Sequence, residues 1–411
     1  MSSDFSGQDV GKRRVMYVPG YDPVHPRKYR ERYRRECRKQ ADISGYEIEI
    51  GPKQSEAKFG WSVTSQIATH KTQADIEVMY WADIVRASMG TGIAATYWQL
   101  LRTAWTYIGS GALFRLARLR KGPVIAALYP VLVLIAQLVF ALAAGWGFAF
   151  GVAHASAALI GIPLTVFGLL MAPFVVWGIL HWFKKHDHLL AYYLMHDYAF
   201  SARLRGAYPP AQEARMAEFG QRIAQALEED VDEVLVVGHS SGAYIAVSML
   251  ADLIRAGRLP KAAPKLALLT LGHVVPMVSF LPKAQRLRAD LAYLAECEQI
   301  TWVDVTAPGD GCSFALCDPV SVSGVAPKGK RWPLVISAAF TQSLKPETWA
   351  AMRWRLFELH FQYLNAFDAP RDYDYFQITA GPISLATRFQ GRAPSKSVIE
   401  VAVNRFTDVA A

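Results

Sequence analysis

The hydrophobic positions of this chain follow two patterns: short strand-like runs that alternate with helical segments, and one long stretch without charge. Runs rich in β-branched or aromatic residues between turn residues predict strands. These strands cover residues 15–18, 46–51, 61–65, 75–81, 233–237, 266–271, 300–305 and 333–337. Helical spacing predicts helices over residues 27–39, 211–229, from 242, 283–297 and 347–364. This alternation predicts an α/β fold with a mainly parallel sheet and helices on both faces.

The uncharged stretch runs from residue 122 to residue 183, which is 62 residues without Asp, Glu, Lys or Arg. It predicts two membrane spans, residues 124–148 and 157–183, each longer than the ~20 apolar residues that cross hydrocarbon. The turn between them is expected at residues 151–156. A buried helical hairpin of a soluble protein is the other interpretation, but such uniformly apolar helices offer no polar face to water.

Basic residues flank both ends of the uncharged stretch, which is the bias of cytoplasmic loops. They are Arg115, Arg118, Arg120 and Lys121 before it, and Lys184 and Lys185 after it. The first residues lack the apolar core of a signal peptide, and the four cysteines show no metal-ligand spacing. We therefore expect a two-span protein of a bacterial inner membrane with its soluble part in the cytoplasm, and no metal site.

The hairpin interrupts the α/β pattern, so five segments are expected. Residues 1–86 and 186–380 form the α/β domain, 87–121 an amphipathic helical segment, 122–185 the hairpin and 381–411 a C-terminal tail. The amphipathic segment, with Tyr97, Leu101, Trp105 and Ile108 at helical spacing, lies either in the membrane interface or against the soluble domain. Within the tail, residues 397–406 could form an edge strand or a helix.

The net charge of +9 is concentrated in one predicted helix, which carries eight basic residues between Arg27 and Lys39. The simplest interpretation is that the basic face of this helix is exposed to solvent and binds no partner. Anionic lipid headgroups come next, because the chain already has a predicted membrane anchor. We expect no nucleic-acid partner, since no recognition module accompanies the charge.

The stretch VVGHSSGAYIAV, residues 236–247, places Ser240 between the end of a strand and the start of a helix. Gly238 and Gly242 remove side chains that would clash where strand and helix approach each other. This G-H-S-S-G stretch resembles the nucleophile elbow of the α/β-hydrolases, which include lipases and esterases. The other interpretation is a glycine-rich turn of an ordinary doubly wound sheet. The resemblance implies that Ser240 is a nucleophile.

The resemblance further implies a base and an acid in the chain order Ser, Asp or Glu, His. His273 and His360 are the histidines after the elbow, and only His360 follows the strand at 300–305, so His360 is the expected base. A packed helical histidine is its other interpretation. Asp310, in a Pro-Gly-Asp-Gly turn after that strand, is the expected acid, as the family's acid occupies such a loop.

Four further residues near the expected triad have other interpretations. Asp318 is a weaker candidate for the acid that could simply initiate a turn, and Asp304 lies inside a strand. His239 is expected to be structural, because its side chain should diverge from the apex of the turn. His273 could line the site without being the base.

Acyl transfer also needs N–H donors for the oxyanion. Ser241 would supply one, and Gly20 with Tyr21, after the first strand, a second; proline and glycine after a strand are also ordinary punctuation. No phosphate-binding or dinucleotide motif occurs, so no cofactor is expected.

We expect a membrane-anchored serine hydrolase that cleaves an acyl ester or thioester of a lipid, with the site close to the cytoplasmic leaflet. An acyltransferase with the same triad, and a catalytically silent membrane scaffold, are the alternatives.

Overall fold

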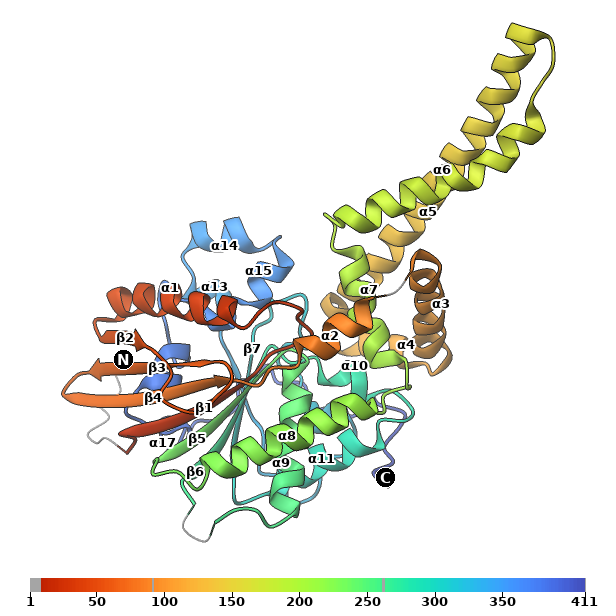
Figure 1. Cartoon of the computed structure of the whole chain (residues 1–411). Helices are drawn as coiled ribbons and strands as arrows, with labels where there is room; N and C mark the ends of the chain where they lie inside the picture. Colours follow the sequence, from red (N-terminus) through yellow and green to blue (C-terminus); the bar gives the residue numbers. More distant parts are fainter. Residues whose placement is uncertain (1–8, 91, 261–262, 411) are drawn as a thin grey trace.

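The computed structural model describes residues 9–90, 92–260 and 263–410, and within them eight strands form one sheet (Figure 1). The strands are β1 (Lys12–Val18), β2 (Glu47–Gly51), β3 (Gly60–Ile67), β4 (His70–Val78), β5 (Glu233–His239), β6 (Lys265–Leu271), β7 (Thr301–Thr306) and β8 (Leu334–Ser337). Their order is β2-β3-β4-β1-β5-β6-β7-β8. Among these eight, only β3 runs against its neighbours, so the sheet is mixed but mostly parallel. The predicted α/β class is confirmed.

Helices cover both faces of the sheet, as the sequence predicts. One face carries α8 (Pro210–Ala226), α9 (Gly242–Arg255), α10 (Val275–Ser279), α11 (Gln285–Glu296) and α12 (Pro319–Val322). The other carries α1 (Arg27–Ser44), α13 (Phe340–Ser343), α15 (Leu356–His360), η1 (Gln362–Leu364), α16 (Tyr375–Ala380) and α17 (Leu385–Arg388). In β5, Val234 and Val236 pack on the first face and Leu235 and Val237 on the second, because successive strand residues point to opposite sides.

The helix predicted over residues 347–364 is wrong in its extent. The chain forms α14 (Pro346–Met352), then a turn, then α15 and the short η1. The residues that it buries are nearly consecutive: Leu359, His360, Gln362, Tyr363 and Leu364. A continuous helix presents only one stripe to the core, so it could not bury this run.

The prediction of a strand or helix over residues 397–406 is also wrong. This part of the tail forms a single bridge, between Cys317 and Ile399, and otherwise has no regular structure. The Asn404 side chain holds it to the domain by donating to the carbonyls of Ser279 and Ser323. Half of the residues of the segment are exposed and the other half only partly buried, so it offers no apolar face that would fix a strand or a helix.

The uncharged stretch forms two long helices, α5 (Lys121–Ile160) and α6 (Thr165–His186), which project from the body of the protein as a hairpin (Figure 1). Both are long and apolar enough to span a membrane. The predicted turn at residues 151–156 is wrong, because this segment is helical and the chain reverses after Gly161, whose φ of +73° ends α5. His154 and Ser156 remain in the helix with their side chains bonded to carbonyls of the preceding turn.

Small residues let the two hairpin helices approach closely. A Cβ added at Gly145 would lie 3.2 Å from the Ala172 carbonyl oxygen, and one added at Gly168 would lie 2.8 Å from that of Ala149. Gly145 and Ala149 are four residues apart, as are Gly168 and Ala172, so each helix offers a pair of small residues one turn apart. This spacing is typical of helix pairs packed in membranes.

Three helices, which we call the collar, lie around the part of α5 nearest the α/β domain (Figure 1). They are α3 (Ile93–Gly109), α4 (Ala112–Leu119) and α7 (Ala191–Ala202), and α2 (Ala82–Met89) lies beside them. Leu100, Leu134 and Met195 form one apolar cluster of this collar. On α3, Leu101, Trp105 and Ile108 are exposed, whereas Tyr97 is partly buried and donates to the Leu134 carbonyl. The segment both packs on the protein and presents an apolar face outward, and contact with lipid stays a prediction.

The basic helix α1 packs on the second face of the sheet. Tyr29, Tyr33 and Cys37 belong to the core there, while Arg27, Lys28, Arg30, Arg35, Arg38 and Lys39 are exposed. Binding of anionic headgroups by this exposed face stays a prediction.

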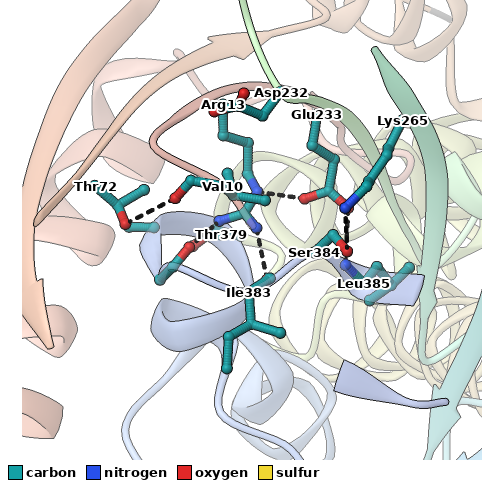
Figure 2. A network of polar contacts seen from close by, with 12 residues as sticks. Val10, Arg13, Thr72, Asp232, Glu233, Lys265, Thr379, Ile383, Ser384 and Leu385 are labelled. Carbon is teal, nitrogen blue, oxygen red and sulfur yellow. Dashed lines mark hydrogen bonds and ion pairs between the residues drawn. The ribbon is translucent and has the colours of Figure 1, made fainter. Parts of the chain in front are cut away.

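At the amino-terminal edge of the parallel strands, a network of buried charges joins β1, β5 and the chain before α17 (Figure 2). Arg13 Nε donates to Glu233 Oε2 at 2.5 Å, and both side chains are fully buried. Arg13 also donates to the carbonyls of Gly381 and Ile383, and Glu233 accepts the N–H of Leu385. All three guanidinium nitrogens of Arg13 and both carboxylate oxygens of Glu233 are therefore hydrogen-bonded within the protein.

Candidate active site

Ser240 occupies a strained turn between β5 and α9. Its φ is +56°, a conformation that a residue with a side chain rarely adopts, and strain of this kind often marks a functional site. A Cβ added at Gly242 would lie 2.0 Å from the Val18 carbonyl oxygen, and one added at Gly238 would lie 2.7 Å from that of Gly242. The two glycines that the sequence singled out are therefore required by close backbone contacts.

Asp310 and His360 lie together, although 50 residues separate them in the chain. His360 Nδ1 lies 2.8 Å from Asp310 Oδ2, and both side chains are almost completely buried. Asp310 follows the end of β7, and His360 ends α15. This contact fixes the imidazole ring and leaves its other nitrogen, Nε2, for a different partner.

Further donors hold the Asp310 carboxylate. Tyr363 Oη donates to Oδ2 at 3.0 Å, and the Cys312 N–H donates to Oδ1 at 2.9 Å. Burial acts to raise the pKa of Asp310, but the attraction of His360 and the hydrogen bonds from His360 and Cys312 outweigh it and lower the pKa below its ordinary value. Asp310 is thus ionised and suited to stabilise a protonated His360.

Ser240 and His360 line the same cavity, of about 370 Å³. Within the described part of the chain, neither the Ser240 hydroxyl nor His360 Nε2 makes a hydrogen bond to another protein group. The His360 ring packs on Gly272 at the end of β6, where an added Cβ would lie 3.2 Å from His360 Cε1. Of the three residues predicted as a triad, Asp310 and His360 are thus in contact, and Ser240 lines the same cavity as His360 without a hydrogen bond to it.

The alternative acids lie elsewhere. Asp318 caps α12 by accepting the N–H groups of Val320 and Ser321, and it also pairs with Lys330. Asp304 accepts the hydroxyl of Thr270 inside the sheet, and burial raises its pKa well above the ordinary value.

The other two histidines have positioning roles. His239 is buried, its Nε2 lies 3.0 Å from the His360 carbonyl oxygen, and burial lowers its pKa to about 3, so it is a neutral support for the His360 backbone. His273 was expected as a residue that could line the site, but it is not among the residues that line the cavity. It is fully buried, with Nε2 against the Cys317 carbonyl, because the chain after β7 folds over it.

Two backbone N–H groups are available beside Ser240. Gly20 lies against it, since an added Cβ would be 3.0 Å from Ser240 Cβ. Gly20, Tyr21 and Ser241 all line the cavity, and the N–H groups of Tyr21 and Ser241 have no acceptor among the residues that the structure describes. These two N–H groups are the expected oxyanion donors.

The cavity lies between the α/β domain and the base of the hairpin. Pro123, Ala126 and Tyr129 of α5 line it, together with residues 188–190 after α6 and one face of α7. Trp354, between α14 and α15, and Leu356 and Phe357, at the start of α15, complete the wall. Trp354, Leu189 and Leu190 are also exposed, so apolar side chains continue from the cavity to the surface beside the hairpin.

Sequence reasoning missed three residues of the site: Tyr363, Gly272 and Asp197. Tyr363, three residues after His360, bridges the Asp310 carboxylate and the Ala307 N–H. Asp197 of α7 lines the cavity, and burial raises its pKa to about 7. The spacing of Tyr363 from His360 could have suggested its role, but no local pattern marks Gly272 or Asp197, because their positions depend on tertiary packing.

Asp310, Cys312 and His360 also offer three donor atoms within 4.8 Å of one another. A metal ion bound to all three would have to share or replace the contact between Asp310 and His360. The existing contact uses both groups as they would act in a proton relay, which needs no metal.

Comparison with protein-family models, with curated proteins and with solved structures found no match to this chain.

Proposed function

We propose that this chain is a membrane-anchored serine hydrolase of the α/β-hydrolase type, cleaving an acyl ester or thioester. One observation carries the proposal: the 2.8 Å contact between buried Asp310 and His360, at the wall of the cavity that contains strained Ser240. A structural ion pair would not require the neighbouring serine to adopt a φ of +56°, nor two unpartnered N–H groups beside it.

The chemistry follows from these positions. In the reaction, Ser240 Oγ must come within hydrogen-bond distance of His360 Nε2, which takes the proton as Oγ attacks the substrate carbonyl carbon. The Tyr21 and Ser241 N–H groups donate to the oxyanion, while Asp310 stays ionised and stabilises the imidazolium. The carbon–oxygen or carbon–sulfur bond then breaks, and the leaving group takes the proton from His360. Water attacks the acyl-enzyme by the same route and releases the acid.

Two contacts support a site at the membrane. The cavity wall includes the base of α5, and an added Cβ at Gly122 would lie 3.1 Å from the carbonyl oxygen of Gly311, next to the candidate acid. The hairpin therefore begins directly on the loop that holds Asp310. An acyl chain leaving the lipid could reach the cavity along the exposed apolar residues Leu189, Leu190 and Trp354. A lipid ester is the substrate class that fits this position.

Labelling with a fluorophosphonate tests the proposal, because the reagent reacts with activated serines. The wild-type protein, in detergent, should be labelled at Ser240, and Ser240→Ala should not be labelled. Ser248→Ala is the matched control: Ser248 lies on α9, the helix that follows Ser240, is bonded to Tyr208 and stands outside the cavity, so this variant should still be labelled. An unlabelled wild-type protein of normal thermal stability would overturn the proposal and favour a silent membrane scaffold.

Product analysis separates hydrolysis from acyl transfer, since both pass through the same acyl-enzyme. Incubation with an acyl ester and increasing concentrations of an alcohol or amine should give free acid as the main product. A product dominated by the acylated acceptor would instead identify an acyltransferase.

A further inference from the structure

Asp197 is a carboxyl group in the cavity that the proposed mechanism does not use. It lies on α7, one helical turn after Tyr193, and it lines the cavity together with Ser240 and His360. Its side chain has no hydrogen bond or ion pair in the described parts of the chain. Asp197 is partly buried, and a carboxyl group that loses part of its hydration without gaining a partner is costly, so its presence in the cavity calls for a ligand or a proton.

The cavity wall around Asp197 offers no fixed cation among the described residues that line it. None of the described residues that line the cavity is a lysine or an arginine. The ionisable groups that interact with Asp197 are His360, the Cys312 thiol and five tyrosine hydroxyls, those of Tyr21, Tyr107, Tyr193, Tyr198 and Tyr244. His360 is already paired with Asp310. The other carboxyl of the cavity, Asp22, is held by Tyr29 Oη and the Val24 N–H, so only Asp197 awaits a partner.

Aromatic rings surround the same space. Tyr21, Tyr193, Tyr198, Phe357 and Phe361 line the cavity, and the rings of Tyr193 and Phe357 lie 6.1 Å apart. Aromatic faces attract cations. This attraction does not depend on a hydrogen bond, so it also binds alkylated ammonium groups that have no N–H to donate. A negative charge set among aromatic rings is complementary to an alkylated ammonium, and it repels phosphates and free carboxylates.

We propose that the cavity selects acyl esters whose leaving group carries an ammonium ion, with Asp197 as the counter-charge and the tyrosine and phenylalanine rings as its walls. The inference rests on the proposed hydrolase function for its kinetic readout, but the ammonium site itself is a property of the cavity. Asp197 does not act on the reacting carbonyl; it sets which ester binds in the orientation that presents that carbonyl to Ser240.

A pair of esters of equal shape tests this selection at pH 8, where the carboxyl is ionised. Butyrylcholine carries a quaternary ammonium, and 3,3-dimethylbutyl butyrate replaces the nitrogen by carbon. The ratio of kcat/KM for the charged over the neutral ester should be at least about 10 in the wild type, which corresponds to about 1.4 kcal/mol of discrimination. In Asp197→Asn, which keeps the shape but removes the charge, the ratio should fall to about 1.

Asp22→Asn is the matched control, because it removes one negative charge from the same cavity wall at a group that already has partners. Its ester ratio should stay within twofold of the wild-type ratio. A ratio that does not change in Asp197→Asn, or that falls equally in both variants, would overturn the assignment.

Binding to the Ser240→Ala protein separates this inference from the proposed function, since no turnover is needed. Choline should bind more tightly than 3,3-dimethylbutan-1-ol by calorimetry, and Asp197→Asn in the same background should abolish the difference. If Ser240 is not labelled by fluorophosphonate and choline still binds through Asp197, the hydrolase proposal fails and the ammonium site stands. If Ser240 is labelled and choline binds no better than the neutral alcohol, the ammonium site fails and the hydrolase proposal stands.

Discussion

Each end of the parallel strands holds a buried carboxylate bonded to a basic side chain, and the two pairs differ in what surrounds them. At the amino-terminal edge, Arg13 and Glu233 are fully buried and bonded to each other and to the backbone of residues 381–385 (Figure 2). At the carboxyl-terminal edge, Asp310 and His360 are bonded equally well but stand at the wall of a cavity.

The difference shows how a buried charge can be assigned to stability or to chemistry. The Arg13 guanidinium and the Glu233 carboxylate each use both ends of the group within the protein. His360 Nε2 has no hydrogen-bond partner among the residues that the structure describes, and His360 lines the cavity together with Ser240. Burial alone therefore does not distinguish a stabilising pair from a catalytic one; a polar atom without a protein partner beside a cavity does. We call the carboxyl-terminal edge, which borders the cavity, the open edge, and the amino-terminal edge the closed edge.

Replacement of the acid at the open edge should have the largest effect. Asp310→Asn removes the charge that stabilises the imidazolium and disturbs the ring's orientation, so kcat/KM should fall by about 10⁴-fold, the loss typical of a triad acid changed to its amide. Ester hydrolysis and the rate of fluorophosphonate labelling both measure it. Asp318→Asn, at the weaker candidate acid, should retain activity, and a comparable loss there would contradict the assignment of the acid.

Replacement at the closed edge should affect stability instead. Glu233→Gln leaves Arg13 buried without its carboxylate, which should cost about 3–5 kcal/mol and lower the apparent Tm by about 10 °C. Labelling of Ser240 well below that Tm should change less than twofold. Glu298→Gln, which breaks an exposed pair with Arg331, is the control and should leave the Tm unchanged. A large loss of labelling in folded Glu233→Gln would contradict the claim that the Arg13–Glu233 pair acts on stability and not on the reactivity of Ser240.

The contact between the hairpin and the open edge allows a third test. Gly122→Ala places a methyl group 3.1 Å from the Gly311 carbonyl oxygen, so the loop that carries Asp310 must shift by a few tenths of an ångström. Because triad geometry is sensitive to such shifts, kcat/KM should fall by about 10-fold without loss of membrane insertion. Gly147→Ala, further along the same helix with nothing within 4 Å of the added atom, should have no effect. Equal activities of the two variants would show that the contact between the hairpin and the Asp310 loop does not affect catalysis.

The sequence predicted the parts of this comparison that depend on local pattern. Residues 233–255 appear as strand, turn and helix where expected, because alternation of apolar residues, two glycines and helical spacing all agree. The pairing of Asp310 with His360 came from the chain order implied by a family resemblance, not from any local signal, and the structure brings the two together.

Other features could not be predicted because tertiary packing decides them. In the uncharged stretch the position of the turn depends on Gly161, and a long apolar pattern does not distinguish one break from another. The reversed direction of β3 is set by a short connection to β4. Asp197 sits in a helix of ordinary composition and becomes notable only because α5, α7 and the segment at 354–357 close a cavity around it.

The smallest expected effect is the pH dependence of stability at Asp197, the unpartnered charge of the open edge. Burial raises its pKa to about 7, from an ordinary value of 3.8, so the folded state prefers the protonated form. Its contribution to stability is complete below pH 4 and is lost as the pH rises towards 7. Asp197→Asn should therefore match the wild-type Tm near pH 4 and exceed it by a few degrees at pH 8. Thermal unfolding in detergent across this range measures the difference, and since both proteins share His360 and the neighbouring tyrosines, most other titrations cancel. Asp22→Asn, which can accept only one of the two hydrogen bonds from Tyr29 and Val24, should instead lower the Tm at pH 8, so a gain of similar size there would refute the role given to Asp197.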